Sequence, residues 1–106
     1  MASIMQGTTP TAIIRIPTKY FLMSDVTAID MKMENDGNIT SYTMDDLEID
    51  IEGNRVMRTL TEEETAALNP KKYVVFQGLF RLGNKVAGID PVVFDVKNMI
   101  GVGKDG

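Results

Sequence analysis

The residues with the most evident chemical potential are the carboxylates in residues 45–54, which read Asp-Asp-Leu-Glu-Ile-Asp-Ile-Glu-Gly-Asn. Clustered carboxylates suggest a calcium site, because Ca²⁺ takes several oxygen ligands that converge from a loop. Glu48, Asp50 and Glu52 alternate with apolar residues, however, and this pattern predicts a strand with its carboxylates about 7 Å apart on one face. The spacing of an EF-hand loop is not matched. We interpret the segment as a solvated strand face and expect no metal site.

Most catalytic arrangements are excluded by composition, because the chain has no His and no Cys. Zinc sites of His and Cys, cysteine nucleophiles, serine–histidine–aspartate triads and disulfides therefore cannot form within it. No spacing of the acids singles out a glycosidase-type pair. The glycines at residues 83 and 101–103 lack the Lys-Ser/Thr of a phosphate-binding loop. We expect a non-enzymatic protein with no catalytic residue and no cofactor.

The charge of the chain is unevenly distributed around a net value of −4. Residues 45–64 hold eight acids and two bases, a local net charge of −6 that leaves +2 for the remainder. No basic stripe with interleaved aromatic residues is present, although phosphate tracking and base stacking would require one. We expect no nucleic-acid partner and interpret the acidic region as a solvated face.

A chain of 106 residues fits one domain. No stretch of it approaches the roughly 18 apolar residues of a membrane helix. Residues 1–9 lack the basic and apolar regions of a signal peptide. We expect a single domain over residues 1–106, no membrane insertion and synthesis in a cytoplasm, with residues 1–9 and 97–106 as flexible ends.

Alternating apolar and polar residues, separated by turn signals about every 8–12 residues, predict about seven strands. Pro10 and Pro17 bracket the first strand, as expected near a sheet edge. The Asp-Gly step at residues 36–37 is the strongest turn signal of the chain. The expected strands are residues 11–16, 26–34, 39–43, 47–51, 55–60, 71–82 and 85–96.

Three further features interrupt or distinguish these strands. Thr61, followed three residues later by Glu64, forms a capping-box pattern and predicts a short helix over residues 61–68. Residues 71–82 carry apolar side chains on both parities, so we expect that strand to be central and buried on both faces. Proline cannot donate to a ladder, so a β-bulge or a break is expected near Asp90-Pro91.

Together these elements predict an all-β fold, an immunoglobulin-like antiparallel β-sandwich of about seven strands with one short helix. A five- or six-stranded barrel is the alternative. The expected core residues are Ile14, Ile16, Ile29, Met31, Leu47, Ile49, Val56, Leu60, Val74, Phe76, Phe80 and Phe94.

Strand and turn motifs along almost the whole chain match those of one phage family. The motifs are Gln6–Thr11, Ser24–Ile29, Asp45–Ile49, Gly53–Val56 and Leu60–Thr65. On these motifs the sequence resembles small prophage-encoded tail and baseplate proteins of Gram-positive bacteria, and is similar to the N-terminal module of the phage baseplate upper protein. The resemblance implies a non-enzymatic virion component that contacts other tail proteins, made in the bacterial host cytoplasm. It brings no catalytic residues.

The expected interaction surface is the first strand with the apolar stretch that follows it, because apolar residues near a sheet edge are contact candidates. The alternative for that stretch is that its side chains cap the core. A second function to consider is a carbohydrate- or surface-binding module, in which exposed aromatic rings stack on sugars. With no Trp, the tyrosines would serve, and Tyr42 is the best placed of Tyr20, Tyr42 and Tyr73. The candidate interaction residues are Tyr20, Phe21, Leu22, Met23 and Tyr42.

The separation of acidic and basic regions suggests head-to-tail contact between subunits in an assembly. Exposed ion pairs are individually weak and are screened by salt. We therefore expect a monomer or a weak dimer in isolation, which assembles further only with other virion or tail proteins.

Overall fold

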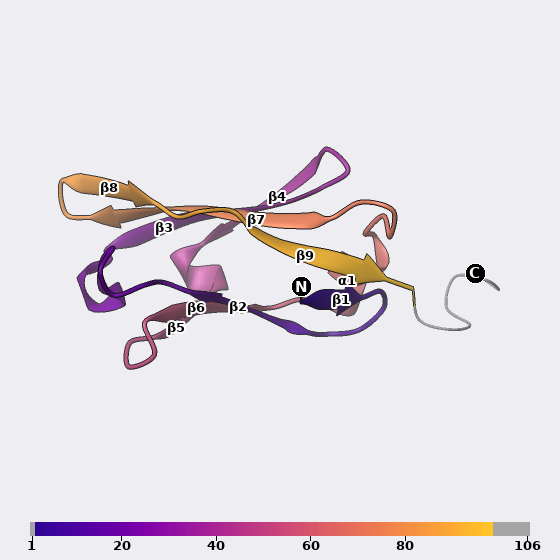
Figure 1. Cartoon of the computed structure of the whole chain (residues 1–106), viewed down its shortest axis with the longest axis horizontal. Helices are drawn as coiled ribbons and strands as arrows, with labels where there is room; N and C mark the ends of the chain where they lie inside the picture. Colours follow the sequence, from indigo (N-terminus) through magenta and orange to yellow (C-terminus); the bar gives the residue numbers. More distant parts are fainter. Residues whose placement is uncertain (1, 99–106) are drawn as a thin grey trace.

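Two β-sheets face each other, and one short α-helix lies near one end of the sandwich (Figure 1). The structure is a computed structural model that describes residues 2–98. The helix, α1, spans Glu62–Ala66, and 3₁₀ turns occupy Met23–Asp25 and Met44–Asp46. The strands are β1 (Ser3–Met5), β2 (Thr11–Arg15), β3 (Ala28–Asn35), β4 (Asn38–Thr43), β5 (Glu48–Asp50), β6 (Arg55–Thr59), β7 (Val74–Leu82), β8 (Lys85–Gly88) and β9 (Val92–Lys97).

The strand order is immunoglobulin-like, as expected. The larger sheet has the order β1-β9-β7-β3-β4, with β8 also paired to β7, and the smaller sheet has the order β2-β6-β5. The chain thus places its second strand with the fifth and sixth, and its third with the fourth and seventh, which is the Greek-key division of an immunoglobulin sandwich. All pairs are antiparallel except β1 with β9.

Two features raise the number of strands in residues 2–98 from the expected seven to nine. Strand β1 lies inside residues 1–9, which the sequence suggested as a flexible end; Ile4 is buried between the sheets and β1 pairs with β9. The last expected strand is divided into β8 and β9. Most of the expected C-terminal end, residues 99–106, lies outside the described residues.

The division between β8 and β9 is the bulge expected near Asp90-Pro91. Strand β7 pairs with β8 through Leu79–Leu82 and with β9 through Val74–Phe76. Two residues of β7 therefore lie opposite the three residues 89–91. One extra residue in one strand is the definition of a bulge, and proline is tolerated there because no ladder bond is required of it.

The core matches the expectation except at the edge of the smaller sheet. Ten of the twelve expected residues are buried, and Leu47 and Ile49 are only partly buried. Strand β5 contains Ile49 and pairs only with β6, so its side chains are covered on one side only. Residues that the sequence did not assign to the core but that are buried include Ile4, Phe21, Met23, Tyr42 and Val96.

The prediction that residues 71–82 are buried on both faces is wrong. Strand β7 is central in its sheet, yet only one of its faces is packed. Val74, Phe76 and Phe80 point into the core, whereas Gln77, Leu79 and Arg81 are exposed. Within the described residues no layer covers this outer face, so the strand alternates as a half-buried strand does.

Candidate interaction surfaces

The apolar stretch Tyr20–Met23 alternates between surface and core. Tyr20 and Leu22 are about half exposed, whereas Phe21 and Met23 are buried, and the Phe21 ring lies 5.0 Å from that of Phe80. The interpretation that the stretch caps the core therefore holds for Phe21 and Met23. Only Tyr20 and Leu22 remain available as contacts for a partner.

Asn54 fixes this stretch from the turn between β5 and β6. Its side-chain Nδ2 donates to Ile16 O (2.9 Å) and Phe21 O (3.0 Å), and its Oδ1 accepts from Met23 N (2.7 Å). Asn54 is buried and adopts φ +50°, a left-handed conformation that asparagine tolerates better than most residues. One side chain thus satisfies three backbone groups of a segment that forms no strand.

Tyr20 and the end of β2 line a small open cavity of about 200 Å³ at the side of the sandwich. The residues of the bulge between β8 and β9 form its other wall. The residues that line it are mainly apolar and include one base and one acid. The lining residues are Ile14, Arg15, Pro17, Tyr20, Ile89, Asp90, Pro91 and Val92.

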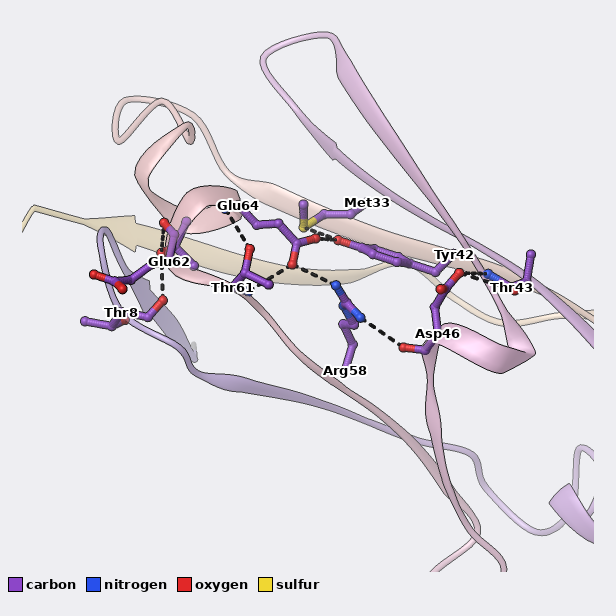
Figure 2. A network of polar contacts seen from close by, with 10 residues as sticks. Thr8, Met33, Tyr42, Thr43, Asp46, Arg58, Thr61, Glu62 and Glu64 are labelled. Carbon is purple, nitrogen blue, oxygen red and sulfur yellow. Dashed lines mark hydrogen bonds and ion pairs between the residues drawn. The ribbon is translucent and has the colours of Figure 1, made fainter.

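The prediction that Tyr42 can stack on a sugar or contact a partner is wrong. Its side chain is 4% exposed and lies between the sheets. Its hydroxyl donates to Glu64 Oε2, and the guanidinium of Arg58 lies over its ring, 4.6 Å from the ring centre (Figure 2). The parity of the strand explains the burial, because Tyr42 shares the inward face of β4 and pairs with buried Met31.

Glu64 is the centre of this polar network, in which three elements meet. Its Oε1 accepts from Arg58 Nη2 of β6 (2.8 Å) and from the backbone N of Thr61 (2.9 Å), which completes the predicted capping box (Figure 2). Arg58 Nη1 also donates to Asp46 O (3.1 Å). Burial alone raises the pKa of Glu64, but the hydrogen bonds from Tyr42, Thr61 and Arg58 outweigh it and lower the pKa overall.

The interactions of this network are those that hold structural elements together. The Glu64 carboxylate is ionised at neutral pH and its oxygens already accept hydrogen bonds, so it is not in the state that a general acid needs. Burial and the Glu64 carboxylate raise the pKa of Tyr42, so its hydroxyl stays protonated. The network ties β4 of the larger sheet, β6 of the smaller sheet and α1 together.

The outer face of the larger sheet carries exposed apolar side chains, among them Leu79 of the strand that was expected to be buried on both faces. We name Val75, Leu79 and Val93 the β7–β9 patch; Val75 and Val93 are cross-strand partners, and Leu79 is 50% exposed. Charges flank it on β3, where Lys32 Nζ lies 3.4 Å from Asp30 Oδ1. Exposed apolar residues with a charged border are typical of protein contact surfaces.

A hollow of about 260 Å³ adjoins Leu79 on this face. It exists because Gly88, the cross-strand partner of Leu79, has no side chain and the strand then turns away at the bulge. Its lining residues are Asp30, Lys32, Gln77, Gly78, Leu79, Gly88 and Ile89. Gln77 and Arg81 point to the same outer face of β7 as Leu79. These two polar residues were the signal in the sequence that one face of the strand is solvated.

The described residues hold no group of three or more Asp or Glu side chains that could bind a metal ion together. Among them there is also no helix long and apolar enough to span a membrane. Comparisons of the chain with protein-family models, with curated proteins and with solved structures found no match.

Proposed function

We propose that the protein is a non-enzymatic structural or interaction module of a phage tail or baseplate, made in the host cytoplasm and carried in the virion, where it binds other virion proteins. The observation that carries the proposal is the β7–β9 patch, in which Leu79 and Val93 are exposed and Val75 is partly buried on the outer face of the larger sheet. The strand and turn motifs resemble those of small tail and baseplate proteins, and this supports a phage tail or baseplate as the assembly in which the protein acts.

The physical basis is the character of that surface. Its apolar side chains come from central strands, so they are held in place by the sheet and lose little freedom on binding. Gln77 lies between Val75 and Leu79 on the outer face of β7, and it and the neighbouring Asp30–Lys32 pair can form hydrogen bonds with a partner. Protein interfaces combine apolar contacts with hydrogen bonds, and this surface offers both.

The proposal is tested on particles from an induced lysogen that encodes this chain. Mass spectrometry of purified particles should detect the protein, and Leu79→Lys should reduce its incorporation at least severalfold at equal expression. Ile51→Lys is the matched control, because Ile51 is similarly exposed (53% against 50%) but lies in the turn after β5 of the smaller sheet. Absence of the wild-type protein from particles, or equal incorporation of both variants, would contradict the proposal.

Carbohydrate binding remains a second candidate function, now at a different tyrosine. Tyr73 is exposed and lines an open hollow of about 390 Å³ together with Glu34 and Asp36. An exposed ring beside carboxylates can stack on a sugar and accept hydrogen bonds from its hydroxyl groups. Calorimetry with host cell-wall polysaccharide tests it: binding that Tyr73→Ala abolishes supports this function, and no heat of binding excludes it for that polysaccharide.

A further inference from the structure

Strand β2 is an open edge of the smaller sheet. It pairs with β6 on one side only. Leu60 N donates to Pro10 O and Ile16 N donates to Asn54 O, both at 2.9 Å, so even-numbered residues direct their backbone groups toward β6. In an antiparallel ladder, the backbone N–H and C=O groups of successive residues point alternately toward one side of the strand and the other. The N–H and C=O groups of Thr11, Ile13 and Arg15 therefore point away from the sheet.

These six outward groups have no hydrogen-bond partner within residues 2–98. Two of the other open edges carry some protection. Strand β5 carries Glu48 and Asp50, and the outward N–H of Thr43 at the end of β4 donates to Asp46 Oδ2 (2.8 Å). Strand β2 has one charge, at its last residue, and none of the inward charges or bulges that usually prevent edge pairing.

We propose that β2 pairs antiparallel with β2 of a second copy of this chain, about a two-fold axis beside Ile13. In this register Ile13 faces Ile13 of the other copy, and Thr11 faces Arg15. The outward groups of both copies then form six backbone hydrogen bonds, and none remains unpaired. An edge that is complementary to itself in this way is what a two-fold dimer requires.

Other registers are worse. A shift by two residues in one direction places Thr11 opposite Pro17, which has no N–H to donate. A shift by two in the other direction places Arg15 opposite Thr9, which lies outside the strand. A shift by one residue puts the outward groups of one copy opposite residues whose groups point to β6. The register centred on Ile13 alone pairs all three residues within the strands.

Side chains and charges also favour a second copy at this edge. Ile13 is 39% exposed and would be covered by its counterpart. Arg15 would lie next to Thr11, so no like charges meet. The joined sheet would have the order β5-β6-β2-β2-β6-β5, with the acidic β5 strands at opposite ends, about 24 Å apart. That separation exceeds a Debye length of about 8–10 Å at physiological salt.

The first test compares proline substitutions at two edges by sedimentation equilibrium. Ile13→Pro removes an N–H that makes no bond within the sheet, so the fold should tolerate it. It should weaken dimerisation roughly tenfold or more, because two intermolecular hydrogen bonds are lost. Ile39→Pro is the matched control: Ile39 is 62% exposed on edge strand β4, and its pairing with Glu34 leaves its N–H outward.

A wild-type chain that stays monomeric up to about 1 mM would overturn the proposal, since no weaker dimer is relevant to an assembly. Weakening by Ile39→Pro but not by Ile13→Pro would also overturn it. Circular dichroism and the urea midpoint of each variant establish that it folds. If Ile13→Pro does not fold, the two tests that follow decide the question with substitutions that leave the backbone unchanged.

The second test uses the absence of cysteine from the chain. In the proposed register the two Ile13 Cα atoms lie about 5.5 Å apart, which is within the range of about 4.4–6.8 Å that a disulfide bridges. Under mild oxidation Ile13→Cys should form covalent dimers much faster than Ile39→Cys. Equal rates for the two variants would overturn the proposal.

The third test examines the register through the pair of Thr11 and Arg15. Thr11→Glu places a carboxylate beside Arg15 of the other copy and should tighten the dimer by roughly two- to tenfold. Thr11→Arg places two guanidinium groups together and should weaken it by a similar factor. The reverse order, or no difference between the two variants, would show that this register is not formed.

Discussion

Tyr42 on β4 donates its phenolic hydrogen bond to Glu64 on α1, and through this contact the larger sheet is joined to the helix that follows β6 of the smaller sheet. Arg58 of β6 donates to the other oxygen of the same carboxylate and lies over the tyrosine ring. The two sheets therefore share one partly buried anion. Each of the three side chains is held in place by the other two.

Removal of the Tyr42 hydroxyl should destabilise the fold. Tyr42→Phe keeps the ring under Arg58 but loses a hydrogen bond to a charged group, which costs about 1.5–3 kcal/mol in the free energy of unfolding. Urea denaturation followed by circular dichroism measures it. Tyr73→Phe is the control, because Tyr73 is exposed and should lose less than about 0.5 kcal/mol. Equal losses of unfolding free energy in the two variants would show that the hydrogen bond from Tyr42 does not stabilise the contact between the sheets.

Glu64 should make stability depend on pH in the acid range. Its folded-state pKa is lowered by hydrogen bonds that outweigh the effect of burial, so the unfolded chain binds more protons than the folded one. The contribution is complete above the ordinary pKa of about 4.5 and is lost as the pH falls through the folded value. Urea midpoints measured between neutral pH and pH of about 3 should therefore decline less steeply for Glu64→Gln.

Glu63→Gln is the control for that pH series, since Glu63 lies on the same helix and is exposed. Its midpoints should follow those of the wild type at every pH. Glu64→Gln should be less stable than wild type at neutral pH and approach it in acid. A constant difference between the two curves would show that ionisation of Glu64 does not support the fold.

Much of the fold could be predicted because the local signals agree with one another. The alternation in residues 26–34 and the Asp-Gly turn at residues 36–37 fix the hairpin of β3 and β4, and Asp36 and Gly37 both adopt the positive φ that this turn demands. The capping box at Thr61 marks the start of α1. Pro91 marks the bulge. Each signal acts over a few residues and needs no knowledge of the partner sheet.

The exposed surfaces could not be predicted in the same way, because exposure depends on what covers a face. The apolar run of β7 is compatible with two buried faces or with one, and only the arrangement of the sheets decides. Tyr42 is similar: strand parity places it on one face of β4, but the cover over that face includes Glu64 and Arg58, which come from distant segments. Ile4 was missed because three residues are too few to show alternation.

Asn54 should be critical for the segment that carries Tyr20. Asn54→Gly keeps the positive φ accessible but leaves Ile16 O, Phe21 O and Met23 N without the side chain that binds them, at a cost of at least about 2 kcal/mol. Asn54→Ala should cost about 1 kcal/mol more, because alanine is strained at φ +50°. Urea denaturation measures both losses.

Hydrogen exchange at the Met23 amide distinguishes this role from a general loss of stability. In both Asn54 variants the amide should exchange faster than the amides of β3, whose ladder bonds are intact. Asn84→Ala, in the exposed turn between β7 and β8, is the control and should leave the Met23 amide protected. Unchanged protection of that amide in Asn54→Gly would show that the side chain does not hold the segment.

Two glycines on neighbouring strands should respond to alanine in opposite directions. A Cβ at Gly78 would lie 2.9 Å from Phe80 Cε1 and 3.0 Å from Met31 Cε, in the packed core, so Gly78→Ala should cost about 1–3 kcal/mol. A Cβ at Gly88 would meet only Leu79 Cδ2, at 3.8 Å, which is an ordinary contact. Gly88→Ala should therefore stabilise the fold by about 0.5–1 kcal/mol, because it restricts the unfolded chain without strain. Thermal and urea unfolding of the two variants measure the difference, and a loss on Gly88→Ala as large as that on Gly78→Ala would show that the hollow beside Leu79 is not open.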